Sequence, residues 1–167
     1  ASPFEPQMVT ISAGPFLMGT PAREVEALAR STGVKVETIE REVPQHEVDL
    51  PAYAISRYPV TNADFRRFIE DEGYANQDYW TAAGWQRKER ENWAQPRHWE
   101  DEQFNDPSQP VVGVSWYEAA AYCRWLTATL DDDCVYRLPR EAEWEYAARG
   151  PESRRYAWGD DWEQDRA

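Results

Sequence analysis

The sequence predicts a mixed domain of short strands, few helices and long loops. Short runs rich in β-branched and aromatic residues near the start are separated by proline and glycine, a pattern typical of short strands. Several later segments carry helical periodicity and recognisable capping residues. Between them lies a long stretch with many tryptophans and little periodicity. With 167 residues, no internal repeat and no linker, the chain is expected to form a single domain over residues 1–167.

The first two strands are expected at Gln7–Ile11 and Gly14–Gly19, with a turn between them. Residues Ala22–Ser31 have helical composition, and Gly33 ends the run. The charged passage that follows, Lys35–Gln45, is expected to be a surface loop without a binding role.

A further strand is expected to begin at His46, because apolar and acidic residues alternate from there. His46, Val48 and Leu50 fall on one face of the strand, and Glu47 and Asp49 fall on the other. His46 is therefore expected to point inward as a hydrogen-bonded structural residue. Two prolines downstream break the segment into short strands.

A helix is expected to begin after Thr61 and to stop at Gly73. Thr61 can cap its first turn, and Asp64 occupies the acidic position of a capping box. The buried stripe of this helix is expected to consist of Phe65, Phe68 and Ile69.

Residues 74–110 are rich in tryptophan, asparagine and proline, and we expect a short helix at Tyr79–Trp85 followed by a long ordered loop. Tyrosine and tryptophan are common anchors at binding surfaces, so this region is a candidate site for a sugar or peptide ligand. The alternative is that the rings form a small core beneath the loop. The candidate ligand-binding residues are Trp80, Trp85, Trp93 and Trp99.

The segment from residue 110 is expected to be a buried strand that enters a helix capped by Ser115 and Glu118. Tyr122 and Trp125 lie on one side of that helix, and a second, apolar seam lies on another, so burial on two faces is expected. The seam consists of Trp116, Ala119, Cys123, Leu126 and Leu130.

The last predicted helix, Glu141–Arg149, carries three glutamates. On a helical wheel they cannot converge on one reacting atom, and at best Glu141 and Glu145 pair one turn apart. Glu143 can reach back to the backbone amide of Arg140, and two apolar sides are expected around Tyr146 and around the tryptophan at position 144. We therefore interpret this helix as architecture, and paired-carboxylate catalysis is disfavoured.

Composition excludes several classes of function. The 31 acidic and 18 basic residues give a net charge of −13, which disfavours nucleic acid and anionic membrane surfaces as partners. No apolar run is long enough for a membrane span. No signal peptide is visible, which slightly favours a cytoplasmic location. The two cysteines do not define a disulfide-rich scaffold.

Four stretches, taken in order, resemble the formylglycine-generating enzyme/sulfatase-modifying factor family. They are MVTISAGPFLMGT, PQHEVDLPAYAISRYPVTNADFRRFI, QPVVGVSWYEAAAYCRWL, and RLPREAEWEYAARG followed by YAWGDD. The resemblance implies an α+β fold, a variant of the C-type lectin fold with little regular secondary structure. It covers the front part of the family domain, so the C-terminal remainder of that domain is an expected partner.

The resemblance places the reactive cysteines of the copper-dependent members, and their calcium ligands, in the later region. No catalytic residue, metal ligand or cofactor is therefore carried onto this chain, although calcium is possible if a C-terminal segment completes a site with the acidic turn after Gly159. Cys123 matches a family cysteine outside the reactive pair and is expected to be an inert buried thiol. A disulfide between Cys123 and Cys134 remains an alternative. An iron site built on His46 and His98 is disfavoured, and His98 is expected at the surface.

Two functions are weighed from the resemblance. The inserted LTATLDDDCVY, an arginine at position 140 in place of threonine, and YANQDYWTAAGWQ lean toward non-enzymatic relatives. The first expectation is therefore a non-catalytic lectin-like scaffold that binds a protein or carbohydrate, like the variable proteins of diversity-generating retroelements, with its binding face in the C-terminal part. The alternative is a copper-dependent formylglycine-generating oxidase of sulfatase-type substrates.

Overall fold

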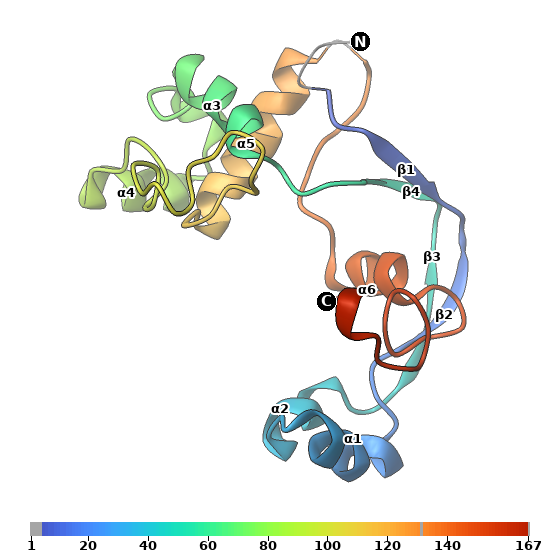
Figure 1. The fold of residues 1–167 in the computed structure, drawn as a ribbon. Coiled ribbons are helices and arrows are strands. Elements are labelled where there is room, and N and C mark those ends of the chain that lie inside the picture. Colours follow the sequence, from blue (N-terminus) through green and yellow to red (C-terminus); the bar gives the residue numbers. More distant parts are fainter. Residues whose placement is uncertain (1–4, 131, 167) are drawn as a thin grey trace. The chain divides into compact units, whose positions relative to one another are not determined.

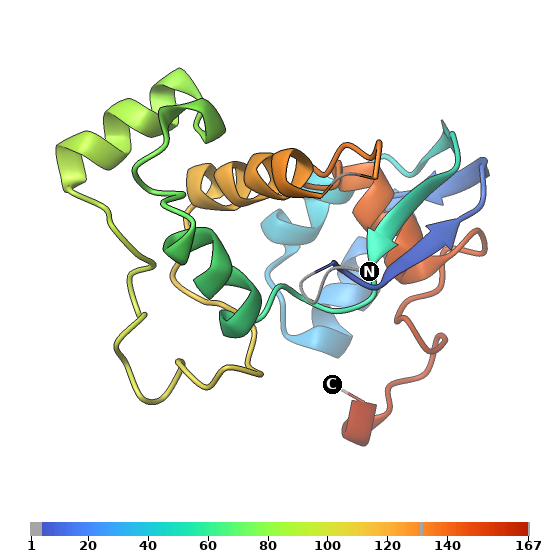
Figure 2. The same ribbon diagram turned by 90° about the horizontal axis from the view of Figure 1, so that it is seen from above.

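A computed structural model describes residues 5–130 and 132–166 of the chain (Figures 1 and 2). The chain divides into two compact units, each with its own apolar core. Unit 1 takes its residues from Ala1–Met8 and Ser56–Leu138, and unit 2 from Val9–Ile55 and Pro139–Ala167. The mixture of helices and strands confirms the coarse prediction of a mixed fold, and the single domain over residues 1–167 stays a prediction. None of the described helices combines the length and apolar character needed to cross a membrane.

In the part of the chain that the structure describes, four short strands form two separate ladders. They are β1 (Met8–Ile11), β2 (Gly14–Met18), β3 (His46–Leu50) and β4 (Tyr53–Ser56). The first predicted strand pairs not with the second but with β4, and β2 pairs antiparallel with β3, so that Phe16 lies opposite Val48. Strand pairing in this part of the chain therefore joins segments that are more than twenty residues apart in sequence.

The core of unit 2 forms between the β2–β3 ladder and α6 (Glu141–Arg149), which packs against β2 (Figure 1). Phe16, Leu50 and Tyr146 are buried there, and the rings of Phe16 and Tyr146 stack with centroids 4.9 Å apart. The predicted alternation of β3 is confirmed for Val48 and Leu50. The inward placement of His46 is wrong: its side chain is exposed at the end of the strand, although its Nδ1 lies 2.9 Å from the carbonyl oxygen of Pro44.

A segment of short helices connects β2 to β3. It contains η1 (Ala22–Glu24), α1 (Val25–Thr32), α2 (Val36–Ile39) and η2 (Glu40–Glu42). Gly33 ends α1 in the left-handed conformation, as predicted, and donates its backbone N–H to Ala29. The expectation of a loop over residues 35–45 is wrong, because Ile39 is 6% exposed and its burial holds a short helix against α1.

The regular elements within residues 57–130 of unit 1 are helices, and α3 and α5 pack together (Figure 2). These elements are α3 (Asn62–Glu70), η3 (Gln77–Tyr79), α4 (Ala82–Glu91) and α5 (Trp116–Thr129). The capping box of Thr61 and Asp64 is confirmed. The short helix expected at Tyr79–Trp85 instead begins at Ala82, because the Thr81 side chain accepts the N–H of Gly84 and caps a longer helix there.

The predicted burial of α5 on two faces is confirmed, with one exception in the seam. The capping box of Ser115 and Glu118 is confirmed, but Trp116 is 62% exposed. Tyr122 and Trp125 point into the aromatic core around Phe65 and Phe68. In the seam, Leu126 is 4% exposed, and Cys123 and Leu130 pack against the same core. No strand forms at residues 110–114, and Pro110 contributes only an isolated bridge to the residue before α3.

The end of α3 explains the glycine at position 73. The N–H of Gly73 donates to the carbonyl of Phe68, and the N–H of Glu72 donates to the carbonyl of Ile69, which is the Schellman arrangement. The left-handed residue in this turn is Glu72, with φ of 58°. Gly73 is needed for another reason, since a Cβ at this position would lie 2.1 Å from the ring of Phe68.

Two adjacent substitutions are therefore expected to have opposite effects on stability. Gly73→Ala should lower the free energy of unfolding by about 3 kcal/mol, because the added methyl overpacks a fully buried ring. Glu72→Gly should raise it by about 0.5–1 kcal/mol, because it relieves a left-handed non-glycine residue. Urea denaturation of both variants measures the difference. Equal effects of the same sign would contradict this account of the turn.

Candidate functional site

The first turn of α6 is built as the sequence predicts. Glu143 is 4% exposed, and its Oε2 accepts the backbone N–H of Arg140 at 2.7 Å. The hydroxyl of Tyr53 donates to the carbonyl oxygen of Glu143, which ties β4 to the helix. Burial, followed by the nearby Glu143 carboxylate, raises the pKa of Tyr53. Glu143 therefore serves as a buried capping residue.

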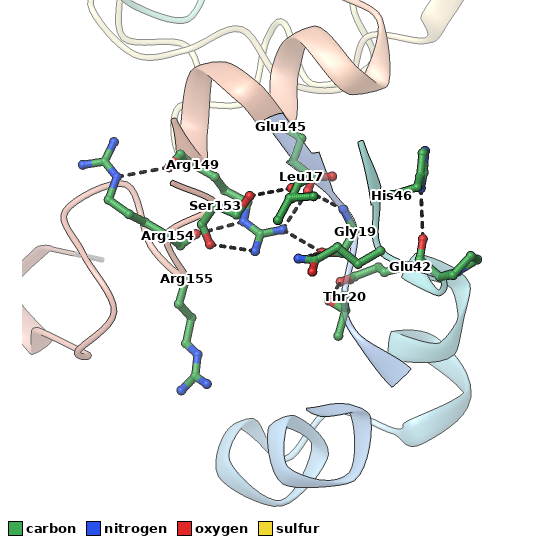
Figure 3. A network of polar contacts seen from close by, with 12 residues as sticks. Leu17, Gly19, Thr20, Glu42, His46, Glu145, Arg149, Ser153, Arg154 and Arg155 are labelled. Carbon is green, nitrogen blue, oxygen red and sulfur yellow. Dashed lines mark hydrogen bonds and ion pairs between the residues drawn. The ribbon is translucent and has the colours of Figure 1, made fainter. Parts of the chain in front are cut away.

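Glu145 pairs with Arg149, one turn along the helix, rather than with Glu141 (Figure 3). Its Oε1 accepts Arg149 Nη1 at 2.7 Å and the backbone N–H of Gly19 at 2.8 Å. Both side chains are mostly buried, with exposed fractions of 19% and 23%. The pair thus fastens the end of β2 to α6.

Arg149 uses every nitrogen of its guanidinium in this network (Figure 3). Nε donates to the carbonyl of Arg154 at 2.9 Å, Nη2 donates to the carbonyl of Ser153 at 3.0 Å, and Nη1 also approaches the carbonyl of Gly19 at 3.3 Å. The hydroxyl of Ser153 in turn donates to the carbonyl of Leu17 at 2.5 Å. One side chain therefore closes the turn after α6 over the end of β2.

The backbone next to this network leaves room only for glycine at position 19. Gly19 has φ of 88°, and a Cβ there would lie 2.3 Å from the carbonyl oxygen of Glu42. Thr20 then donates its hydroxyl to Glu42 Oε2 at 2.7 Å and its backbone N–H to the Glu42 carbonyl at 2.9 Å. These contacts bring the end of η2 beside the first turn of α6.

An open pocket of about 440 Å³ lies at this junction. Trp144 lines this pocket, and its side chain is 63% exposed. The second apolar side predicted for α6 is therefore not buried at Trp144. The residues lining the pocket are Glu42, Pro139, Arg140, Glu141, Trp144 and Glu145.

The four tryptophans predicted to bind a ligand all lie in or against the core of unit 1. Trp80 is 5% exposed, and its indole N–H donates to the carbonyl of Gly73 at 2.9 Å. The other three are partly buried, and each has a basic group of this chain over its ring. The pairs are Lys88 with Trp85 at 4.4 Å, Arg66 with Trp99 at 5.0 Å, and Arg87 with Trp93 at 5.9 Å. Their role as ligand anchors stays a prediction.

A buried carboxylate in unit 1 was not recognised as such from the sequence. Glu118 is 4% exposed: its Oε1 accepts the hydroxyl of Tyr74 at 2.6 Å, and its Oε2 accepts the backbone N–H of Ser115 at 2.6 Å. Burial, and then the Glu118 carboxylate, raise the pKa of Tyr74 far above its usual range. The sequence could have indicated this burial, because Glu118 is a capping glutamate on a helix that was expected to be buried on two faces.

The two cysteines are both free, so the disulfide considered as an alternative does not form. Burial raises the pKa of Cys123 to about 11, in agreement with the expected inert thiol. Cys134 is exposed on the connection after α5.

A metal centre needs several ligand side chains close together. In residues 5–130 and 132–166, no three histidine, cysteine, aspartate or glutamate side chains gather in a way that would hold a metal ion. His98 is exposed, as predicted, and its ring contacts Phe104. In the acidic turn, Asp160 accepts the backbone N–H of Arg155 at 2.9 Å. The side chains described therefore do not fit a copper, iron or calcium site by themselves.

The network of Figure 3 predicts a measurable stability difference. Glu145→Gln should lower the free energy of unfolding by about 1–2 kcal/mol, since it keeps an acceptor for Gly19 but removes a mostly buried ion pair. Glu26→Gln is the matched control, because Glu26 pairs with Arg30 at the same i,i+4 spacing but on the exposed face of α1. Its effect should stay below about 0.5 kcal/mol. Equal losses in urea denaturation would show that burial of the pair is unimportant.

The cysteines should differ in reactivity. At pH 8 a thiol with a pKa near 11 is about one part in a thousand thiolate, so Cys123 should react slowly with a thiol reagent, whereas the accessible Cys134 should react first. Quantification of released thionitrobenzoate should give one fast equivalent in the native chain and two after denaturation. Cys134→Ser should abolish the fast phase; a fast phase that survives in this variant would overturn the assignment.

Comparison with known proteins places these features in a family. The family model described as "Sulfatase-modifying factor enzyme 1-like domain" matches residues 2–167. Hercynine oxygenase of Mycolicibacterium thermoresistibile is 39% identical over 135 residues, which cover 73% of this chain and 28% of that protein. Formylglycine-generating enzyme of Bos taurus is 29% identical over 178 residues, covering 92% of this chain and 42% of the enzyme.

Two further comparisons bear on fold and function. A Mus musculus protein named inactive C-alpha-formylglycine-generating enzyme 2 is 32% identical over 188 residues, covering 97% of this chain and 54% of the relative. The solved structure of PvdO from Pseudomonas aeruginosa superposes with a TM-score of 0.60 at 28% identity, covering 90% of this chain and 50% of PvdO. The chain thus spans between 28% and 54% of the length of these proteins. By the extent of these matches, the chain belongs to the family of the sulfatase-modifying factor enzyme 1-like domain.

Proposed function

We propose that this chain is the framework part of an oxidase-type enzyme that uses dioxygen. The observation that carries the proposal is the similarity to hercynine oxygenases, which reaches 39% identity over 73% of the chain. Similarity to formylglycine-generating enzymes of cattle and of Streptomyces coelicolor, at 29% and 35% identity, supports the same general chemistry.

The expectation of a non-catalytic lectin-like scaffold of the retroelement variable-protein type is wrong. That expectation depended on three short stretches in which the chain departs from the enzymes of the family. Hercynine oxygenases that are 34–39% identical to the chain overturn it. An arginine at position 140 illustrates the physical reason. The helix keeps its capping carboxylate from Glu143, so the lost threonine cap does not mark a different kind of molecule.

The contribution of the described residues is structural. The buried carboxylates of Glu118 and Glu143 cap helices, and Glu145 pairs with Arg149; no metal-binding set is present among the described residues. The reacting groups are therefore proposed to lie on polypeptide beyond these residues. Completion of the domain by a C-terminal remainder, a calcium ion shared with that remainder, and the C-type lectin variant as the exact fold belong to this same proposal.

The hercynine oxygenases and the formylglycine-generating enzymes among the relatives differ in the class of substrate. Hercynine is the compound named in relatives that are 34–39% identical, and a cysteine-containing sulfatase-type peptide is the substrate of the alternative weighed from the sequence. The higher identity favours hercynine or a similar small molecule as the first substrate to test.

Oxygen consumption by the protein, expressed as its gene encodes it, tests the proposal. With iron(II) or copper supplied in the assay, we expect dioxygen uptake that depends on hercynine or on the cysteine peptide. Matched controls are histidine in place of hercynine, and a peptide with serine in place of cysteine. Uptake with the peptide alone would assign the formylglycine-generating reaction. A folded protein that consumes no dioxygen with either substrate under both metals would overturn the oxidase-type function.

A further inference from the structure

Trp144 has an unusual environment for a tryptophan of this chain. Of the nine tryptophans, it is the one whose ring has no aromatic or cationic neighbour among the described residues. It is 63% exposed, although it lies in the middle of α6 and next to the buried Glu143. An open indole of this kind is typical of a binding surface rather than of a core.

The pocket beside Trp144 has a distinct charge. Its lining holds three carboxylates, from Glu42, Glu141 and Glu145, against the single guanidinium of Arg140. Glu145 is already paired with Arg149, and Glu42 accepts the hydroxyl of Thr20. Glu141 is exposed and forms no hydrogen bond or ion pair with any described residue, so its carboxylate is available to a partner. The pocket thus combines an open aromatic face with an uncommitted negative charge.

Other tryptophan rings of this chain contact cationic side chains. In unit 1, Lys88, Arg66 and Arg87 each place their charge over a tryptophan ring, at 4.4, 5.0 and 5.9 Å from the centroid. These contacts are attractive because the ring face is negative. Trp144 has an equivalent ring face, with a carboxylate beside it, and lacks the cation.

We propose that the pocket formed by Trp144 and Glu141 is a docking site for an arginine side chain of a partner polypeptide. A guanidinium is planar, so it can stack on the indole while its edge donates to the Glu141 carboxylate. Lysine would satisfy the charge but not the stacking. The surplus of acidic residues in the whole chain, with a net charge of −13, favours approach of a basic segment.

Titration with a minimal probe tests the site without knowledge of the partner. The indole N–H signals of the ¹⁵N-labelled protein are recorded while N-acetyl-arginine-methylamide is added, and Trp144→Phe identifies the signal of Trp144. We expect a saturable shift of that signal with a dissociation constant on the order of millimolar. The neutral isostere N-acetyl-citrulline-methylamide should cause no saturable shift, and the lysine amide should bind at least threefold more weakly.

Three variants complete the test. Glu141→Gln should weaken binding of the arginine amide by about three- to tenfold, and Arg140→Ala should strengthen it about twofold, since it removes a like charge. Trp116→Ala is the matched control, because Trp116 is 62% exposed on α5 but lies against Tyr117. It should leave the affinity unchanged. Equal shifts with citrulline, equal affinity for lysine, or no effect of Glu141→Gln in a folded protein would overturn the proposal.

Discussion

The guanidinium of Arg149 is the constraint on which unit 2 depends. It pairs with Glu145 and donates to carbonyls of the turn at Ser153 and Arg154, while Glu145 holds the backbone N–H of Gly19. No lysine could replace it, because one ammonium cannot reach several acceptors in fixed directions at once. The polar appearance of α6 therefore reflects the need to satisfy backbone groups where a strand end, a helix and a turn meet.

Capping carboxylates at helix starts are a second feature that both units share. Asp64, Glu118 and Glu143 each occupy the third position of a helix and accept the backbone N–H of the residue before it, at 3.0, 2.6 and 2.7 Å. Two of these carboxylates are buried, which explains how an acidic chain can contain charged residues within its interior. Each buried charge has backbone or hydroxyl donors, so its desolvation is offset locally.

Local patterns predicted the capped helix starts at Thr61, Ser115 and Arg140 well, and they predicted long-range pairing poorly. The bounds of α6 and the three capping carboxylates followed from spacing alone, because caps and periodicity depend on neighbouring residues. The partner of β1 did not, since it depends on β4, a segment distant in sequence. The open face of Trp144 was missed for the same reason, because a helical wheel shows which residues share a side but not whether anything covers it.

The uneven placement of tryptophan gives the two units different optical properties. Six of the nine tryptophans belong to unit 1 and three to unit 2. Those of unit 1 include the rings nearly shielded from water, at positions 80 and 125, whereas two of the three in unit 2 are more than half exposed. The blue edge of the tryptophan emission should therefore report on unit 1, so that a fluorescence experiment can follow the loss of that core apart from the rest of the chain.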